Sequence, residues 1–430
     1  MATKYWLGNS PAVAQVQNYT LAGTWEANDI IRAKIGQKSF DTSAGSTVAA
    51  TIAQTFVDAW NALSQIQYPE FQEITASRSG DDIILTADTA GVPFTCSLTP
   101  LESDGSPAGG AEQTIEGAAV ATNGSTTTTS TGPNDWSSVM NWSDGAVPAD
   151  GDTVIIENSS ISILYGLSNA TVDLTELNIR STFTGTIGLP DHNGKYAEYR
   201  TTHLTLGTTA GAMTLKVGEG DGHGSGRIKI SIGTVVNICT CVVFATGRGL
   251  DAGLPAFLFK AASGANHTLE AYGNSEVGVG VLAGDTATIV TLTVAGNAQV
   301  RCGTGVTLTT TNVGGRGARL QTESNITTAT ITNEGGTHLD LAGNVTTLHV
   351  HGGKFDYRGA GTISTANVRD GGELTFAEDG TTRVVSACNA FSGAIIRDPF
   401  KSTGGIAVAV KTHLKNVTLE LGSDLTLTRS

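Results

Sequence analysis

Apolar residues recur at a fixed interval through residues 286–385, where one short pattern is repeated about five times. Each repeat carries an apolar anchor, and successive anchors lie 19, 18, 19 and 18 residues apart. One or two glycines follow each anchor within five positions, and glycine tolerates the positive φ that a tight corner requires. The anchors are Val294, Val313, Ile331, Val350 and Val368.

Two further apolar positions complete each repeat. A pair with one residue between its members follows the corner, and a third anchor precedes the next repeat. The pairs are Leu339/Leu341, Phe355/Tyr357 and Leu374/Phe376, and the third anchors are Val306, Ile326, Val345 and Ile363. The pattern predicts three short strands in each coil.

One such coil cannot bury its own apolar face, but stacked coils can, at the interstrand spacing of about 4.8 Å. We therefore predict a mainly β protein whose larger part, residues 136–430, is a β-solenoid. We favour a right-handed parallel β-helix, because the hexapeptide pattern of left-handed solenoids is not present. The other hand stays open for a coil this short.

The first unit, residues 1–103, combines strand patterns at 13–21, 30–35, 73–76, 83–87 and 94–98 with one helix pattern. Ser46 or Thr47 can cap this helix, and its apolar residues recur at steps of three and four. They are Val48, Ile52, Phe56, Ala59, Trp60 and Leu63. An apolar helix face needs a sheet to cover, which predicts a small α+β domain of order ββαββ.

Residues 104–135 are rich in Ser, Thr and Gly, and we interpret them as a linker with one strand near 114–120. Trp136 and Trp142 follow at once. The first coil of a solenoid has no preceding coil, so these rings are expected to plug its open end. Stacking on carbohydrate is the alternative role for them.

Composition narrows the function. A net charge of -14 and a pI near 4.9, without a basic stripe, argue against a nucleic-acid partner. No signal-peptide pattern and no run of about 20 apolar residues is present, so we expect synthesis in a cytoplasm and no membrane insertion. The five cysteines form no CxxC pair, which favours small buried side chains over disulfides or metal ligands. They are Cys96, Cys239, Cys241, Cys302 and Cys388.

Several stretches along nearly the whole chain resemble a group of proteins of tailed bacteriophages and phage-like loci. They lie at 5–8, 23–26, 85–94, 162–167, 185–190, 198–200, 224–227 and 397–399. The resemblance implies a virion structural protein with a small N-terminal α+β domain and a C-terminal β-helix, of the head-fibre or tail-fibre type. It brings no catalytic motif and no cofactor.

One enzymatic hypothesis comes from the repeats. If the apolar pairs point inward, Asp340 and Asp356 point outward on adjacent coils about 5 Å apart, as in a retaining glycosidase. The neighbouring outward column, His338, Lys354 and Glu373, has mixed charge and is typical of a solvated face. We favour the solvated face, and we predict no catalytic residues.

Two further motifs suggest binding. His349 and His351 flank an inward valine and can hold a metal ion if a third ligand is supplied, but surface histidines are the favoured interpretation. The glycine-rich segment 218–226 resembles calcium and phosphate loops, yet it occurs once and a strand pattern follows it. We therefore predict no metal and no cofactor.

We predict a non-enzymatic virion structural protein at the virion surface, a homotrimeric head fibre or capsid decoration. Its partners would be the major capsid protein or tail and baseplate proteins. One alternative is a tail-fibre adhesin that binds host-surface glycan through loops such as 191–199. A second is a polysaccharide-degrading tailspike.

Overall fold

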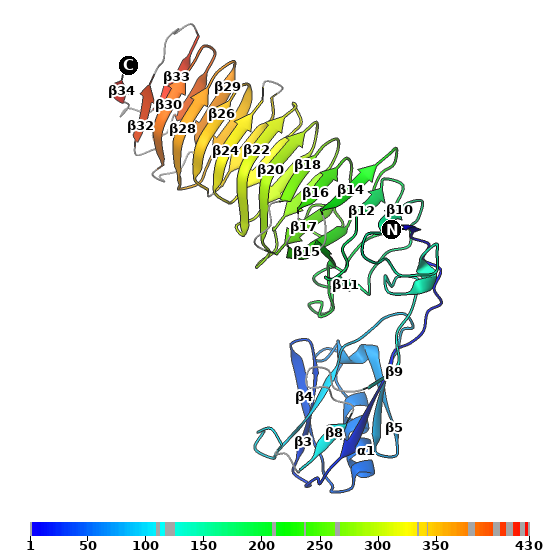
Figure 1. Cartoon of the computed structure of the whole chain (residues 1–430). Coiled ribbons are helices and arrows are strands. Elements are labelled where there is room, and N and C mark those ends of the chain that lie inside the picture. The colour runs from blue at the N-terminus through cyan, green and yellow to red at the C-terminus, as the bar shows by residue number, and fades with distance from the viewer. Residues whose placement is uncertain are drawn as a thin grey trace.

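The computed structural model describes residues 2–108, 112–116, 125–208, 212–235, 238–262, 267–332, 335–341, 343–376, 383–398, 405–409, 416–421 and 426–428. It confirms a mainly β fold with a small α+β domain and a β-solenoid, but the order ββαββ is wrong, because the described part of that domain has three strands before its helix and five after it. A small N-terminal α+β domain is followed by a long β-solenoid, and the two lie end to end (Figure 1).

Over the residues that the structure describes, two parallel sheets form the solenoid, one of fourteen strands and one of twelve. The fourteen-stranded sheet contains β1 (Thr3–Tyr5), β10 (Thr153–Ile156), β12 (Glu176–Arg180), β14 (Met213–Glu219), β16 (Cys239–Val243), β18 (His267–Ala271), β20 (Ala287–Ala295), β22 (Val306–Gly314), β24 (Ile326–Ile331), β26 (Val345–Val350), β28 (Thr362–Val368), β30 (Val384–Ala390), β32 (Gly405–Ala409) and β34 (Thr426–Thr428). The twelve-stranded sheet contains β11 (Ser168–Asn169), β13 (Leu204–Thr208), β15 (Ile228–Val235), β17 (Phe257–Ala261), β19 (Glu276–Val279), β21 (Gln299–Cys302), β23 (Arg319–Thr322), β25 (Thr337–Asp340), β27 (Gly353–Tyr357), β29 (Gly372–Phe376), β31 (Ile395–Asp398) and β33 (Thr418–Leu421). The chain alternates between the two sheets.

The strand register confirms the anchors of the sequence pattern. Val294, Val313, Ile331, Val350 and Val368 pair in that order across β20, β22, β24, β26 and β28. All five side chains are buried. The interval of 18 or 19 residues is therefore one turn of the solenoid.

The third anchors do not form strands of their own, so the prediction of three strands per coil is wrong. Val345 and Val350 lie on the same strand, β26, and the alternation of buried and unburied residues changes between them. Val306 is also misaligned, because Leu308 occupies the register position next to Ile326.

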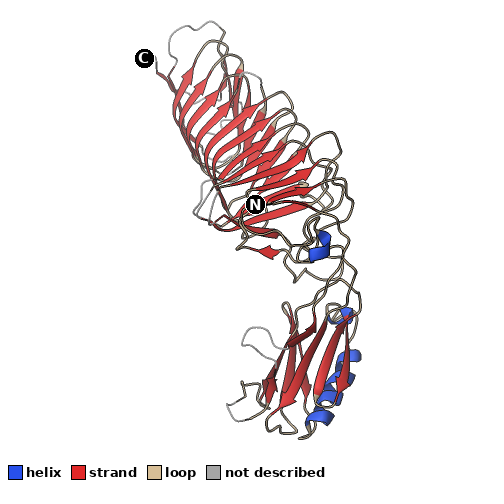
Figure 2. Cartoon of the chain, turned by 45° about the vertical axis from the view of Figure 1, so that its right-hand side comes forward, coloured by secondary structure: helices blue, strands red, loops and turns tan. Residues whose placement is uncertain are grey.

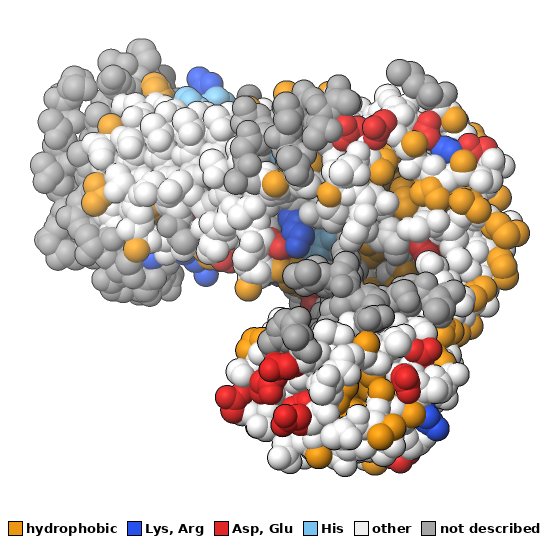
Figure 3. All heavy atoms as spheres, turned by 60° about the horizontal axis from the view of Figure 1, so that its bottom comes forward, with side chains coloured by type: hydrophobic (Ala, Val, Ile, Leu, Met, Phe, Trp, Pro, Cys, Tyr) orange, Lys and Arg blue, Asp and Glu red, His pale blue; other side chains and the backbone are white. Residues whose placement is uncertain are grey.

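Threonines line the outward side of the fourteen-stranded sheet. Eight of them pair in unbroken register on strands β14 to β28, namely Thr214, Thr240, Thr268, Thr291, Thr310, Thr328, Thr347 and Thr365. Adjacent threonines in register support a sheet through their methyl and hydroxyl groups. The column gives this face an uncharged polar surface, and few charged side chains appear on the solenoid in the space-filling view (Figure 3).

In its described residues, the N-terminal domain contains two antiparallel sheets and one α-helix (Figure 2). Its strands are β2 (Val16–Ala22), β3 (Ile30–Ile35), β4 (Lys38–Ser43), β5 (Ile74–Ser79), β6 (Asp82–Ala87), β7 (Ser97–Leu101), β8 (Thr114–Glu116) and β9 (Ser125–Thr128). Helix α1 (Ala49–Asn61) buries Phe56 and Trp60 against the sheets, and the short 3-10 helix η1 (Phe71–Glu73) follows it. The N-cap residue is Val48 rather than Ser46 or Thr47.

The segment expected to be a linker with one strand near 114–120 contributes two strands: β8 confirms the expected strand over its described part, and β9 was not expected. β8 and β9 both pair with β2, so the domain's sheet extends past the predicted boundary at residue 103. The first residues belong to the solenoid, because β1 pairs with β10. The domain is thus inserted between two solenoid strands, and the chain crosses between the units twice (Figure 1). The crossings meet where Val13 N–H donates to Thr131 O at 2.8 Å.

Three tryptophans close the first coil. Trp6, Trp136 and Trp142 are buried in the solenoid core, and the ring of Trp142 meets the other two edge-on at 5.2 and 4.7 Å. The indole N–H of Trp142 donates to Trp136 O at 2.8 Å. Burial confirms the plug and leaves none of these rings free to stack on a sugar.

Candidate ligand-binding groove

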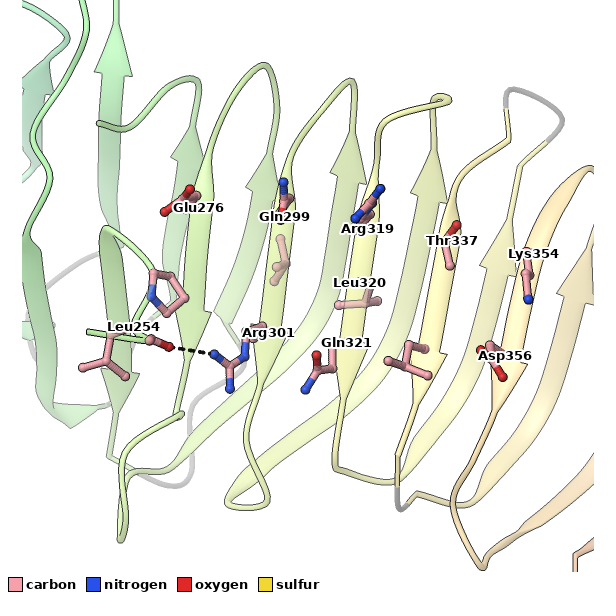
Figure 4. A pocket seen from close by; sticks show the side chains of 14 residues that line it. Leu254, Glu276, Gln299, Arg301, Arg319, Leu320, Gln321, Thr337, Lys354 and Asp356 are labelled. Atoms are coloured by element: carbon pink, nitrogen blue, oxygen red, sulfur yellow. Dashed lines mark hydrogen bonds between the residues drawn. The ribbon is translucent and has the colours of Figure 1, made fainter. Parts of the chain in front are cut away.

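A groove of about 660 Å³ lies on the outward face of the twelve-stranded sheet (Figure 4). It crosses β19, β21, β23, β25 and β27, so it runs along the solenoid axis. The loop between β16 and β17 forms one wall with Leu254 and Pro255. A second hollow of about 570 Å³ adjoins it and shares Glu276, Gln299 and Arg319.

The floor consists of two columns of outward side chains, produced by the two-residue period of a strand. The first column reads Glu276, Gln299, Arg319, Thr337 and Lys354 in register. The second reads Arg301, Gln321, Leu339 and Asp356. Neighbouring members of a column are about 4.8 Å apart at the backbone.

Positive charge exceeds negative charge in these two hollows. The cations are Arg248, Arg301, Arg319 and Lys354, and the carboxylates are Glu276 and Asp356. This balance is opposite to the net charge of -14 on the whole chain.

Both carboxylates already have partners. Asp356 accepts from Arg358 Nη2 at 2.9 Å, and Glu276 accepts from Gly249 N–H at 3.1 Å. Arg301 donates to Gly253 O at 2.9 Å, the contact drawn in Figure 4. Within the described part of the chain, the cationic groups of Arg319 and Lys354 have no protein partner. These two groups are available to a ligand.

The structure contradicts the Asp340 and Asp356 pair. Asp340 is fully buried and lies in register with Tyr357, while Asp356 lies in register with Leu339. The two carboxylates are therefore on opposite faces of the sheet. Asp340 accepts instead from Gly343 N–H inside the solenoid, at 2.8 Å.

His338 was expected to point outward for the same reason, and it too points inward. It is fully buried, and its Nε2 lies 2.9 Å from Thr322 Oγ1. Burial lowers the pKa of this imidazole to about 3. In register, His338 lies between Leu320 and Phe355 in an otherwise apolar column.

The misassignment arises at the corners. In the strand register, the first inward residue after the corner is His338 in one coil and Phe355 in the next. His338 comes seven positions after Ile331, whereas Phe355 comes five positions after Val350. The corner length thus varies from coil to coil, so alternation cannot be counted across it. Choosing the inward side by hydrophobicity selected Leu339, one position away, and a slip of one residue exchanges the two faces.

His349 lies on β26 and His351 directly after its end; both are half-buried, and their ring centroids are 5.7 Å apart. His351 Nδ1 lies 3.3 Å from Arg369 Nη2, and His349 Nδ1 lies 3.5 Å from Asn367 Nδ2. Within the described ranges, no group of three or more His, Cys, Asp or Glu residues is placed to hold a metal ion.

The glycine-rich segment 218–226 is a packed corner. Gly224 N–H donates to Ser181 O at 2.9 Å, and Ser225 Oγ donates to Gly185 O at 2.5 Å. A Cβ at Gly222 would lie 2.4 Å from Ser181 O, so glycine is needed for close packing of the coils. Strand β15 follows, so the segment does not lead into a helix as a phosphate loop does.

The loop 191–199, considered as a ligand-binding loop, contacts the N-terminal domain. Tyr196 hydroxyl donates to Glu73 Oε1 at 2.5 Å, and Tyr199 packs against the core of that domain. Arg200 adds ion pairs to Glu198 at 2.8 Å and to Glu73 at 3.4 Å. No local pattern predicts this interdomain clamp, because Tyr196 and Glu73 are 123 residues apart in the chain.

All five cysteines are buried free thiols, as predicted. Burial raises the pKa of Cys96, Cys239, Cys302 and Cys388 to about 12, so these thiols are neutral in the folded protein. Their place is in the packing of the strands.

No protein-family model, no curated protein and no solved structure matches this chain. In the described residues, no helix has the length and apolar character needed to span a bilayer.

Proposed function

We propose that the chain is a non-enzymatic, rod-shaped virion structural protein, a homotrimeric head fibre or capsid decoration on the virion surface. The N-terminal domain would bind the major capsid protein or a tail or baseplate protein. The solenoid would project from it.

The junction between the two units carries this proposal. A projecting rod needs a fixed angle to its base, and here two chain crossings and the interdomain clamp hold that angle. Tyr196 and Arg200 of the solenoid both reach Glu73 of the domain. The sequence resemblance to phage virion proteins supplies the particle to which such a base would attach.

Electron cryomicroscopy of the intact particle tests the proposal. We expect rod-shaped density at three-fold positions of the shell, with the α+β domain at its base. Density at the tail tip would favour the tail-fibre alternative, and no such density on the particle would refute both.

The groove favours a second candidate function, an adhesin that binds host-surface glycan. It is elongated, runs across five strands and offers guanidinium, amide and hydroxyl groups, all of which hydrogen-bond to sugars. A glycan-binding screen with the purified chain tests it, and failure to bind any glycan would remove this candidate.

We propose no catalytic role. The carboxylate pair that suggested polysaccharide cleavage is divided between the two faces of the sheet, and Asp340 is fully buried. Viscometry of polysaccharide solutions containing the protein checks this, and a falling viscosity would contradict it.

A further inference from the structure

We propose that the groove on the twelve-stranded sheet binds an extended acidic polysaccharide in which carboxylated sugars alternate with neutral ones. The inference rests on the second candidate function, glycan binding, and names the ligand class.

The charge of the ligand follows from the charge of the groove. Asp356 and Glu276 are engaged by protein groups, whereas Arg319 and Lys354 have no protein partner in the described part of the chain. Arg319 is exposed and Lys354 is half-buried. A cationic groove on a chain of net charge -14 attracts an anion that the rest of the surface repels.

The shape of the ligand follows from the direction of the groove. Its floor crosses five strands at about 4.8 Å each, so its length is on the order of 20 Å while its width is that of two side-chain columns. An extended chain several sugar rings long fills such a groove. Gln299, Gln321 and Thr337 lie along it to bind hydroxyl groups.

The spacing of the two cations that have no protein partner in the described part of the chain indicates the repeat length of the polysaccharide. Arg319 on β23 and Lys354 on β27 are in the same column with Thr337 between them, so their backbones are two strands, about 10 Å, apart. That spacing is close to the length of two sugar rings in an extended polysaccharide. A polysaccharide with a carboxylate on every second sugar therefore places one carboxylate at Arg319 and the next at Lys354. Arg319 can bind its carboxylate in the bidentate geometry.

Single-stranded nucleic acid is also an extended anion, but the groove does not favour it. Proteins that hold single strands supply aromatic rings for the bases to stack on. The described lining of this groove contains no aromatic residue, and Leu254, Pro255 and Leu339 are among its apolar members.

The test is titration calorimetry of the full chain with four defined ligands. They are an oligosaccharide of alternating uronic acid and neutral hexosamine, a fully acidic oligogalacturonate, a neutral maltooligosaccharide and an oligothymidylate of similar length. We expect the alternating oligosaccharide to bind most tightly, with an affinity that falls as salt rises.

The variant Arg319→Gln with Lys354→Gln removes both cations from exposed or half-buried positions. It is expected to weaken binding roughly tenfold or more, since a hydrogen bond to a charged group contributes about that factor or above. The matched control, Lys34→Gln with Arg78→Gln, removes one lysine and one arginine from exposed positions of the N-terminal domain, outside the groove, and should change the affinity less than about twofold.

The outcomes are distinct. Equal loss in both double variants would place the site elsewhere and overturn the proposal. Tightest binding of the neutral oligosaccharide would overturn the acidic ligand while leaving the adhesin function intact, and tightest binding of oligothymidylate would replace the ligand class. Binding of none of the four would overturn the inference, but rod density on the particle would still support the structural role.

Discussion

The buried imidazole of His338 makes the stability of the solenoid sensitive to acid. Burial lowers its pKa to about 3, whereas a histidine in an unfolded chain titrates near 6.5. The folded state therefore binds the proton less well than the unfolded state. Its contribution is fully present above about pH 6.5 and is lost as the pH falls toward 3.

The size of the effect follows from the two pKa values. At about pH 5, protonation of the unfolded state alone costs the folded state about 2 kcal/mol, from 1.36 kcal/mol for each of about 1.5 pH units. His338→Leu places an apolar side chain in the column that contains Leu320 and Phe355. The free energy of unfolding should then fall about 2 kcal/mol less than in the unchanged chain between about pH 7.5 and about pH 5.

Urea unfolding followed by far-ultraviolet circular dichroism at the two pH values measures this difference. Thr322→Val is the control, because it removes the hydroxyl 2.9 Å from Nε2 but keeps the buried imidazole. It should lower stability by about 1 kcal/mol at both pH values and leave the acid loss in place. An acid loss in His338→Leu equal to that of the unchanged chain would refute the inward placement of this residue.

Three further predictions concern the junction between the two units, the tryptophan plug of the first coil (called the cap below) and the thiols. Tyr196→Phe removes the hydrogen bond to Glu73, so the distance distribution from small-angle X-ray scattering should broaden. Tyr272→Phe, which breaks a Tyr–Glu contact within the solenoid, should leave it unchanged, and equal broadening would contradict the clamp. Trp142→Ala should lower the free energy of unfolding by about 3–5 kcal/mol through a cavity in the cap. Met140→Ala, at a side chain 56% exposed, should cost less than about 1 kcal/mol, and similar losses would argue against the cap. The five buried thiols should not react with an aromatic disulfide reagent at about pH 8 until the chain is unfolded, and rapid reaction of the native protein would show that a thiol is exposed.

The sequence was sufficient to predict the parts of the fold in which apolar residues recur at a regular interval. The anchors from Val294 to Val368 repeat at the interval of one coil, and the register pairs them as the pattern predicts. It was insufficient wherever a corner intervenes, because corner length varies and the two-residue period restarts after it. His338 and Asp340 were placed on the wrong face for this reason.

Long-range pairing was also beyond the pattern. The three residues of β1 are too few to show a period, and only their pairing with β10 reveals that they belong to the solenoid. The groove has a similar origin, since its cations come from β21, β23 and β27 and each looks like an ordinary outward residue in its own strand. Stacking the coils is what brings them into one surface.

The double crossing has a mechanical consequence. A domain joined to a rod by one chain segment can rotate about that segment. A domain inserted between β1 and β10 is joined by two chain segments, which share torque and tension. These segments are also bonded to each other where Val13 meets Thr131, so neither can extend before that contact separates. A sideways force at the far end of the solenoid, such as drag from flowing liquid, would therefore be transmitted to the N-terminal domain as a bending moment and would not be dissipated by rotation at the junction.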